Sequence, residues 1–548
     1  MKQFPLNPVD YYGTFSDFVD GLAEKYAEKP AVSYFTQKQE EVMHTYGTFT
    51  DQIYALRESL AADGLAGKHI AILSENSYAF LVTYLAITAC GAVAVCIDAE
   101  QSDDTIRQML SLADVNAAFV AGPYLPICLS VLPKEAIFSL PGRTEEGVRS
   151  FDQLCETGRE ALSARSAGRA YALDPDQPAV IVFTSGTSSL AKPVVLTHRN
   201  ILQNASDSML YVHMYDRVFT HLPFYHTYGM TCSVLNVLVQ GLHLFINGNL
   251  KTVMRDMLLS KPDTLVTVPL MLEAIRNQIW LSAEQAGKAG QLKKLFRLAG
   301  VLRRLGLRPK FKALAAIREK AFGSIRIIIS GGAALSIDTA REFDLLGIAV
   351  LQGYGITECS PLISVNSNHS HRIGSVGHVL PSLRIKIVDG EIWVTGPSLM
   401  PGYYQSPELT AEALEDGWFK TGDIGYIDSK DFLFITGRKK NLIVFKNGKK
   451  VSPEKMEEMV QQIPLVKEVV VYGATSGSSA DDTKLAASIY PDPIRSANMN
   501  AYEILAHLQS GIDDINASLP FYQHIQMISI RQQPFAKTGS QKIKRHLV

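Results

Sequence analysis

The chain has 548 residues, of which 47% are hydrophobic, so it can bury more than one core and form several domains. Its net charge of −1 argues against nucleic acid as a partner, because such binding usually needs a clustered excess of Lys and Arg. The six cysteines show no CxxC spacing, which favours reduced core residues of a cytoplasmic protein. The N-terminus lacks the apolar run of a signal peptide, and we expect no transmembrane segment because no uninterrupted apolar run is long enough.

Residues 10–121 alternate between helical and strand patterns. Apolar spacing predicts helices over 15–26, 50–62, 80–90 and 103–113, and short apolar runs predict strands over 31–34, 69–73, 92–97 and 117–121. This alternation is typical of layered α/β sheets. Residues 140–177 are rich in Gly, Arg and Glu, and we interpret them as a linker.

An apolar run over 179–183 predicts a buried strand that ends in small, mostly hydroxylated residues. These are Thr184, Ser185, Gly186, Thr187, Ser188 and Ser189. Such a loop can turn its N–H groups and hydroxyls around an anion, and Lys192 can add positive charge, which suits a polyphosphate. The alternative is a Ser/Thr-rich surface turn, because the spacing lacks the second Gly and the Ser or Thr after Lys that mark the common phosphate loop.

A predicted helix over 199–212 is followed by a loop in which His221 and His226 accompany aromatic residues, Pro and Gly. This loop could form the wall of a pocket, although a loop histidine more often has a structural role. The apolar run over 228–244 could line an apolar tunnel or fill the core. Its candidate residues are Met230, Val234, Leu235, Val237 and Leu238.

Residues 281–321 are polar and basic. They include Lys293, Lys294, Arg297, Arg303, Arg304, Arg308, Lys310 and Lys312. A solvated helical face is the usual interpretation of such a run. Peripheral contact with a membrane surface, or contact with an acidic partner, is the alternative.

Two predicted strands, over 326–330 and from 350 onward, each lead into a glycine turn. The small residues of the first turn, Gly331, Gly332, Ala333 and Ala334, would let a flat base approach the backbone. In the second turn Tyr354 offers a ring for a purine, Thr357 a hydroxyl for phosphate, and Glu358 a carboxylate suited to Mg²⁺. Ligands of open α/β sheets bind at the ends of neighbouring strands, so we expect both turns to line one crevice.

Frequent glycines and short β-like runs predict a compact β subdomain over 372–436. Near its end Asp423 follows Gly422, and its carboxylate could accept hydrogen bonds from both hydroxyls of a ribose. The alternative is a turn aspartate that bonds to its own backbone.

Six segments resemble, in the right order, the motifs of the adenylate-forming enzymes, which include acyl-CoA synthetases, carrier-linked adenylation domains and luciferases. These segments are 184–192, 222–226, 353–358, 417–423, 435–443 and 537–543. The resemblance covers nearly the whole chain and is strongest to the fatty-acyl-CoA ligases. Each segment alone is a weak signal, but six in register are a specific one.

The resemblance implies both a fold and a reaction. It implies an N-terminal adenylation domain of layered α/β sheets over 1–436, which includes the β subdomain, and a small mobile α+β lid over 437–548. Such enzymes bind ATP and Mg²⁺, convert a carboxylic acid into an acyl-adenylate with release of pyrophosphate, and pass the acyl group to a thiol, usually of coenzyme A. The implied substrate is a medium- or long-chain fatty acid.

The resemblance also implies roles for single residues. The phosphates would be held by Thr184, Ser185, Gly186, Thr187, Ser188 and Lys192. Adenine would be held by Gly332, Ala333, Ala334 and Tyr354, and the ribose by Asp423 and Arg438. Gly355 and Ile435 would also belong to the cofactor site. Thr357 would contact the α-phosphate, Glu358 would bind Mg²⁺, and His226 and Lys542 would be catalytic. A fixed cation and Mg²⁺ would stabilise the charge that builds up as the triphosphate is attacked.

The implied lid turns about Lys440 between the two half-reactions, because Lys542 must reach the phosphate and then clear the site for the thiol. Gly448 belongs to a loop that would line the path of the pantetheine arm, and the neighbouring lysines could meet the phosphates of coenzyme A.

The chain departs from the usual family pattern at Ser189, Ala191, Pro193 and Gln541. Gln541 replaces a Gly before Lys542, and Gln reaches positive φ less easily, while Pro193 removes an N–H donor. Two alternatives therefore stay open. One is a ligase that loads the phosphopantetheine arm of a carrier protein, with the basic stretch 293–312 receiving this acidic partner. The other is a low-turnover sensor that binds nucleotide and acyl groups.

Overall fold

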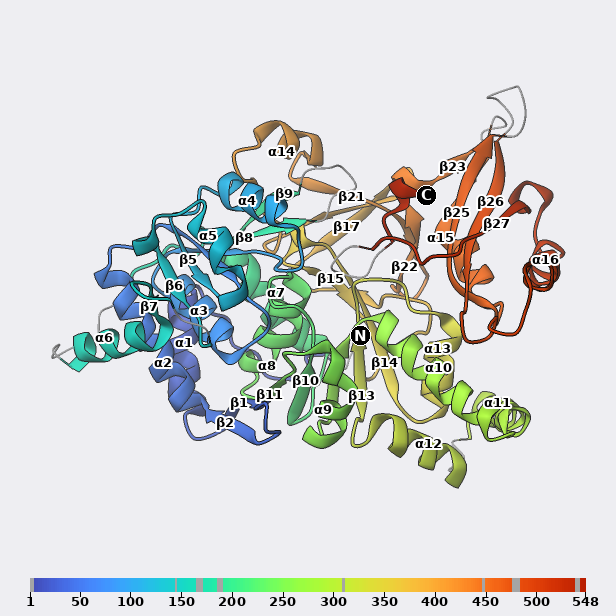
Figure 1. Cartoon of the computed structure of the whole chain (residues 1–548), viewed down its shortest axis with the longest axis horizontal. Coiled ribbons are helices and arrows are strands. Elements are labelled where there is room, and N and C mark those ends of the chain that lie inside the picture. The colour runs from blue at the N-terminus through green and yellow to red at the C-terminus, as the bar shows by residue number, and fades with distance from the viewer. Residues whose placement is uncertain are drawn as a thin grey trace.

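The computed structural model describes residues 4–142, 145–163, 171–184, 191–307, 311–445, 449–475, 483–537 and 543–548. Two large sheets with helices between and around them form the N-terminal body, and a small β sheet joins it to a C-terminal part (Figure 1). The mixed α/β fold that the sequence predicts is confirmed.

The first large sheet has eight strands in the order β19-β9-β8-β4-β3-β5-β6-β7. Their bounds are β19 Gly402–Tyr403, β9 Lys192–Thr197, β8 Pro178–Thr184, β4 Val93–Cys96, β3 His69–Leu73, β5 Ala117–Val120, β6 Ile137–Ser139 and β7 Arg149–Ser150. The strands from β8 to β7 run parallel, whereas β9 and β19 are antiparallel to their neighbours. The β8–β9 hairpin therefore returns the chain at the end of the parallel strands.

The second large sheet has nine strands in the order β16-β15-β14-β13-β12-β10-β11-β1-β2. Their bounds are β16 His378–Val379, β15 Leu362–Val365, β14 Ala349–Gly355, β13 Ile327–Ser330, β12 Thr264–Thr267, β10 Arg217–Thr220, β11 His243–Ile246, β1 Pro30–Phe35 and β2 Glu41–Thr45. The six strands from β14 to β1 are parallel. Central parallel strands are buried on both faces, which explains apolar runs such as Ile327–Ser330.

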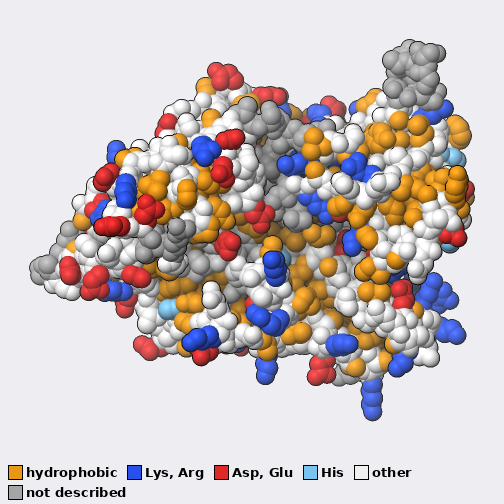
Figure 2. Space-filling view, viewed as in Figure 1, with side chains coloured by type: hydrophobic (Ala, Val, Ile, Leu, Met, Phe, Trp, Pro, Cys, Tyr) orange, Lys and Arg blue, Asp and Glu red, His pale blue; other side chains and the backbone are white. Residues whose placement is uncertain are grey.

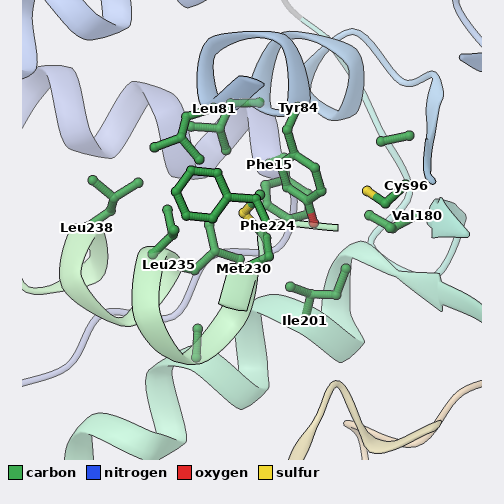
Figure 3. Close-up of a cluster of buried hydrophobic side chains, with 14 of the residues drawn as sticks. Phe15, Leu81, Tyr84, Cys96, Val180, Ile201, Phe224, Met230, Leu235 and Leu238 are labelled. Atoms are coloured by element: carbon green, nitrogen blue, oxygen red, sulfur yellow. The ribbon is translucent and has the colours of Figure 1, made fainter. Parts of the chain in front are cut away.

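Helices fill the space between the two sheets. They are α1 Phe15–Tyr26, α2 Tyr46–Ala62, α3 Tyr78–Ala89, α7 His198–Tyr211 and α8 Asn236–Val239, the last preceded by a π-helical stretch, Tyr228–Leu235. All twelve residues of α3 are buried, as expected for a helix between two sheets. Figure 3 shows side chains of this central core, among them Phe15, Tyr84 and Phe224.

The outer faces of the sheets carry further helices. Beside the nine-stranded sheet lie α9 Val253–Ser260, α10 Pro269–Gln285, α11 Ala289–Arg304, α12 Lys312–Phe322 and α13 Ile337–Leu345, and beside the eight-stranded sheet lie α4 Asp103–Leu112 and α5 Leu125–Leu129. The layers are therefore helices, sheet, helices, sheet, helices (Figure 1).

The predicted β subdomain is a five-stranded antiparallel sheet that pairs β17, β18, β21 and β20, with β22 added to β21. Its strands are β17 Arg384–Val388, β18 Glu391–Thr395, β20 Leu414–Glu415, β21 Trp418–Ile427 and β22 Leu433–Arg438, and α14 spans Pro407–Ala413.

The C-terminal part packs around a core of its own. It contains β23 Ile443–Val444, β24 Lys450–Val451, α15 Pro453–Val460, β25 Val466–Thr475, β26 Thr483–Pro491, α16 Ala501–Asn516 and β27 Ile525–Ile530. Contacts to the body include the pair Arg495 and Glu284, 3.3 Å apart.

The interpretation of residues 140–177 as a linker is wrong over its middle. Residues Phe151–Ser163 form α6, which packs against α2. A Cβ at Gly158 would lie only 1.7 Å from the carbonyl oxygen of Ala55, so this glycine permits close helix packing instead of marking a loop. Helix α2 also begins at Tyr46, four residues earlier than predicted, because Thr45 accepts a hydrogen bond from Thr48 N–H as the N-cap.

Candidate active site

The base of the expected phosphate loop is a β hairpin. Thr184 ends β8, Lys192 begins β9, and the two residues are register partners. Ser185, Gly186, Thr187, Ser188 and Ser189 lie outside the described residues, so their expected phosphate contacts stay predictions. Pro193 lies within β9, where it faces Phe183 and its carbonyl accepts a hydrogen bond from Tyr404 N–H, 2.8 Å away.

Lys192 is connected to Glu358 through a residue that sequence reasoning missed. The Nζ of Lys192 lies 5.2 Å from the centre of the Tyr403 ring, and the Tyr403 hydroxyl donates to Oε1 of Glu358 over 2.9 Å. Tyr403 occupies this place because β19 pairs with β9, with Tyr403 opposite Val194. Burial and the charge of Glu358 raise the pKa of Tyr403, so this phenol remains a donor at neutral pH.

The first expected glycine turn follows β13, which lies beside parallel β14. The second is wrong in position, because Gly353, Tyr354 and Gly355 belong to β14 and pair with β15; the chain turns only afterwards, at Thr357–Cys359. Ser330 at the end of β13 is the register partner of Gln352 in β14. The backbone of Gly332, with φ of +83°, and the next two residues, Ala333 and Ala334, are exposed at this edge. A Cβ at Gly355 would lie 2.1 Å from the carbonyl oxygen of Pro361, so only Gly fits there.

Asp423 lies within strand β21 and is buried, so the alternative of a turn aspartate is wrong. The Tyr354 hydroxyl donates to its Oδ2 over 2.6 Å, and Nε of Arg438 lies 2.7 Å from its Oδ1. Arg438 is the register partner of Asp423 across the β21–β22 pair. Burial, and then the charge of Asp423, raises the pKa of Tyr354 well above its usual value.

Positive charges gather on the same side. The pKa of Lys440 is lowered, first by desolvation and then by the positive charges of Arg438 and Lys192. The negative charge of Asp423 raises this pKa and so opposes the shift. Arg438 pairs with Asp423, and Lys192 lies beside the Tyr403 ring. The three cations come from β9, β22 and the turn after β22. Such a cluster favours an anionic ligand.

Ile435 lies in β22, opposite Gly425 of β21, and is half-buried. Thr357 and Glu358 follow β14 in a short 3-10 helix, and both are half-buried. Tyr354 in β14 and Thr357 and Glu358 just after it therefore lie close together along the chain. Tyr354 links this segment to Asp423 through its hydrogen bond.

The two histidines of the aromatic loop differ in role. His221 is buried, its Nε2 lies 2.8 Å from Oγ1 of Thr267, and burial lowers the pKa of His221 to about 4. Such a neutral buried histidine supports structure. His226 is half-buried, and its Nδ1 accepts a hydrogen bond from Tyr228 N–H, 3.2 Å away. The catalytic role expected for His226 stays a prediction.

A small, largely apolar cavity of about 20 Å³, room for about one water molecule, lies at the ends of β13 and β14. It is lined by Ser330 and Gly353 at those ends, and by Tyr228 and Cys232 of the π-helical stretch. Tyr228 hydroxyl donates to the carbonyl of Thr267 over 3.0 Å, and a Cβ at Gly331 would lie 3.0 Å from Cζ of its ring. Gly331 therefore permits Tyr228 to lie between the cavity and the first glycine turn.

The other apolar candidates of the run 228–244 fill the core. Met230, Val234, Leu235, Val237 and Leu238 are all buried. Met230 also borders a second, very small cavity of about 10 Å³ next to His226. Its other lining residues include Tyr84, Cys96, Val180, Ile201 and Phe224 (Figure 3).

Gly448, Gln541 and Lys542 lie outside the described residues, so the expected roles of Gly448 and Lys542 stay predictions. Lys537 and Ile543 form an antiparallel bridge, and Nζ of Lys537 lies 2.7 Å from Oε1 of Glu468.

A second feature that sequence reasoning missed is buried Glu391 of β18. Its Oε2 lies 2.7 Å from Nζ of Lys439, and its Oε1 accepts a hydrogen bond from Gly422 N–H, 3.0 Å away. Glu391 therefore connects Lys439, which precedes Lys440, with Gly422, which precedes Asp423. The sequence does contain a signal for this role, because Glu391 begins an otherwise largely apolar strand, Glu391–Thr395. A carboxylate buried in such a strand needs hydrogen-bonding or charged partners.

The donor set fits a nucleotide with Mg²⁺. In the described part of the chain no group of three or more His, Cys, Asp or Glu side chains could hold a metal ion. Mg²⁺, however, commonly takes only one or two protein carboxylates and completes its shell with phosphate oxygens and waters. Glu358 meets that requirement beside the base of the expected phosphate loop.

Comparison with known proteins gives sequence relatives over most of the chain. Long-chain-fatty-acid–CoA ligase FadD15 of Mycobacterium bovis is 29% identical over 455 residues, which cover 77% of this chain and 74% of that protein. The long-chain-fatty-acid–CoA ligase of Escherichia coli O157:H7 is 28% identical over 88% of this chain and 86% of its own length. The peroxisomal long chain acyl-CoA synthetase 7 of Arabidopsis thaliana is 28% identical over 90% of this chain and 75% of its own length.

Solved structures share the fold. Anthranilate CoA ligase AuaEII in complex with anthranoyl-AMP gives a TM-score of 0.80 at 19% identity and covers 98% of this chain and 96% of that chain. The o-succinylbenzoate CoA synthetase MenE from Bacillus subtilis with ATP and magnesium ion gives 0.72 at 20% identity, over 96% and 98%.

The family models agree with these matches. Residues 440–548 match the AMP-binding enzyme C-terminal domain, and residues 19–404 match the AMP-binding enzyme model itself. The resemblance to the adenylate-forming enzymes is therefore confirmed, and this chain belongs to the AMP-binding enzyme family.

Proposed function

We propose that this protein converts a medium- or long-chain fatty acid into its coenzyme A thioester, using ATP and passing through an acyl-adenylate. The observation that carries the proposal is the junction of a cationic site with an apolar cavity. Lys192 lies beside Tyr403, whose hydroxyl donates to Glu358 after β14. Arg438 pairs with Asp423, which accepts a hydrogen bond from Tyr354 of β14. The small cavity borders Ser330 and Gly353 of β13 and β14. A triphosphate and an acyl chain would meet there.

In the first half-reaction, a carboxylate oxygen of the acid bonds to the α-phosphorus as the bond to pyrophosphate breaks. Asp423 would accept hydrogen bonds from the ribose, and Thr357 would donate to the α-phosphate. Lys192, together with the predicted Lys542, would stabilise charge on the phosphates. Bound at Glu358, Mg²⁺ would neutralise phosphate charge.

In the second half-reaction, the thiol sulfur of coenzyme A bonds to the acyl carbonyl carbon, AMP leaves, and the thiol proton passes to solvent. The C-terminal part must then present a different surface to the site. Lys440 lies between the β subdomain and that part and is our candidate for the hinge. We also propose a cytoplasmic location, since all six cysteines are buried thiols, as in a reducing compartment.

The relatives support fatty acids as substrates, because three of them are named for long-chain acids. An independent reason is the apolar lining of the small cavity, which includes Met209, Val212, Met214 and Cys232. An acyl chain would have to displace these side chains and would then lie in apolar surroundings.

Mass spectrometry of the products tests the proposal. The purified protein would be incubated with ATP, Mg²⁺, coenzyme A and straight-chain fatty acids of graded length, with Lys542→Ala as control. Acyl-CoA, AMP and pyrophosphate are the expected products. Acyl-AMP that yields thioester only with a phosphopantetheine carrier protein would show that the acceptor is wrong. The absence of any product above the Lys542→Ala variant would favour the sensor and contradict the proposal.

A further inference from the structure

The segment around α11 has an unusual charge pattern. Between Glu284 and Glu319 the chain carries no Asp or Glu, although the whole sequence has 54 of them and a net charge of −1. The basic residues that the structure describes there are Lys288, Lys293, Lys294, Arg297, Arg303, Arg304, Lys312 and Arg318. This part of the surface is therefore strongly cationic on a protein that is nearly neutral.

Helix α11 uses only one face for packing. Leu292, Phe296 and Ala299 are buried in the core beside the nine-stranded sheet. On another face, Leu298, Val301 and Leu305 are 49%, 50% and 70% exposed, and Leu307 just beyond the helix is 54% exposed. Leu298 and Val301 lie within α11 and Leu305 is its C-cap residue, so the spacing 298, 301, 305 places the three side chains along one stripe.

Basic side chains border this apolar stripe. Lys294, Arg297 and Arg304 are exposed and lie on the same side of the helix, since they are three or four positions from Val301 or Leu298. Arg303 pairs with Asp344 over 2.5 Å. Within the described residues, the other three form no ion pair with a carboxylate, so their charges face solvent.

Helix α11 lies at the edge of the molecule, away from β14 and β21 of the active site (Figure 1). In the space-filling view, Lys and Arg side chains project from this lower right edge (Figure 2). A flat surface could approach the helix without meeting the site. In the described part of the chain, no helix is long and apolar enough to cross a membrane, so contact would be peripheral.

We propose that the outer face of α11 binds the surface of an anionic lipid bilayer. The helix would lie in the plane of the interface, with Leu298, Val301 and Leu305 among the upper acyl carbons and Lys294, Arg297 and Arg304 beside lipid phosphates. An acidic protein or another polyanion would account for the basic residues, but not for a stripe of exposed apolar side chains between them. Fatty acids partition into bilayers, so such contact would bring the enzyme to its proposed substrate.

Vesicle flotation tests the proposal. The full chain would be mixed with vesicles of phosphatidylcholine alone, or of phosphatidylcholine with phosphatidylglycerol. Three proteins would be compared with the wild type: Lys294→Glu/Arg297→Glu/Arg304→Glu, Leu298→Ser/Val301→Ser/Leu305→Ser, and a control with matched charge change on other surfaces, Lys38→Glu/Lys68→Glu/Lys467→Glu. All nine positions are exposed, so folding should persist, and the melting temperature checks this.

We expect the wild type and the lysine control to bind only the anionic vesicles. Charge reversal should weaken binding about a hundredfold or more, and loss of the apolar stripe at least about tenfold. Failure of the wild type to bind anionic vesicles would overturn the proposal. An effect of charge reversal without any effect of the serine variant would also overturn it, because simple attraction to polyanions, such as an acidic carrier, would then suffice. Activity on a short, water-soluble acid should be unchanged in all variants, which separates this test from that of the proposed function.

Discussion

The network around Asp423 allows a sharp test of the nucleotide site. The change Asp423→Asn keeps the size of the side chain but replaces one carboxylate oxygen by an NH₂ group and removes the charge. Asp423 now accepts from the Tyr354 hydroxyl and pairs with Nε of Arg438. In the variant, the new NH₂ group would face one of these two donors, and two donors cannot form a hydrogen bond with each other. A ribose hydroxyl would also lose a charged acceptor.

The structure sets the size of the effect. A buried hydrogen bond to a charged group contributes about 1.5–3 kcal/mol, which applies to the 2.6 Å contact from Tyr354 because the side chain of Asp423 is only 4% exposed. The Arg438 side chain is 42% exposed, so we assign its pair with Asp423 only about 0.2–1 kcal/mol. The free energy of unfolding should therefore fall by about 2–4 kcal/mol.

If Asp423 also binds the ribose, ATP binding weakens in addition. The loss of a charge-assisted hydrogen bond predicts an increase in the Kd for ATP of about ten- to a hundredfold. Isothermal titration of ATP without acid measures it, and urea unfolding measures stability separately. Asp416→Asn is the matched control, because Asp416 is an exposed turn carboxylate of the same β subdomain and should leave both values unchanged. A variant that loses stability as calculated but binds ATP like the wild type would refute the ribose assignment.

Three further predictions follow from single contacts. Tyr403→Phe removes the hydroxyl that donates to Glu358 but keeps the ring beside Lys192, so we expect kcat for adenylate formation to fall about tenfold; an unchanged kcat would mean that Glu358 needs no support. Cys232→Leu places a larger apolar side chain at the small cavity, so kcat/KM should shift toward shorter acids; the melting temperature checks folding, and an unshifted length profile would place the acyl chain elsewhere. His198 is buried, and burial lowers its pKa to about 4, so its stabilising contribution is present above pH 6.5 and is lost as the pH falls toward 4. His198→Asn keeps an acceptor for Phe15 N–H and should reduce the acid-induced loss of unfolding free energy by at most about 3 kcal/mol in urea titrations; identical pH dependence would contradict this.

Local patterns in the sequence were sufficient for much of the fold. The strands at 69–73 and 117–121 were predictable because parallel strands buried on both faces are short and apolar. The turn at Gly331 and the segment around Tyr354 could be placed together because β13 and β14 are parallel and adjacent. The end of β14 was less predictable, since Gly353–Gly355 continue this strand by pairing with β15. The composition of residues 140–177 does not predict α6, because a glycine such as Gly158 can permit close contact with Ala55 instead of marking a loop.

Long-range pairing explains what could not be predicted in the site. Tyr403 reaches Glu358 only because β19 pairs with β9, some two hundred residues earlier in the chain, and no local spacing contains that information. The partners of Asp423 depend likewise on the β21–β22 register, which places Arg438 opposite it, and on β14, which supplies Tyr354. Sequence motifs named Asp423 and Arg438, but not their mutual contact.

Exchange of labelled pyrophosphate into ATP tests the central claim most directly, because it requires reversible formation of an acyl-adenylate and needs no coenzyme A. We predict exchange that depends on both a fatty acid and Mg²⁺, and that is lost in the Lys542→Ala variant. Production of ADP and phosphate from ATP, with no pyrophosphate exchange in the presence of any fatty acid, would contradict an adenylate mechanism for this protein.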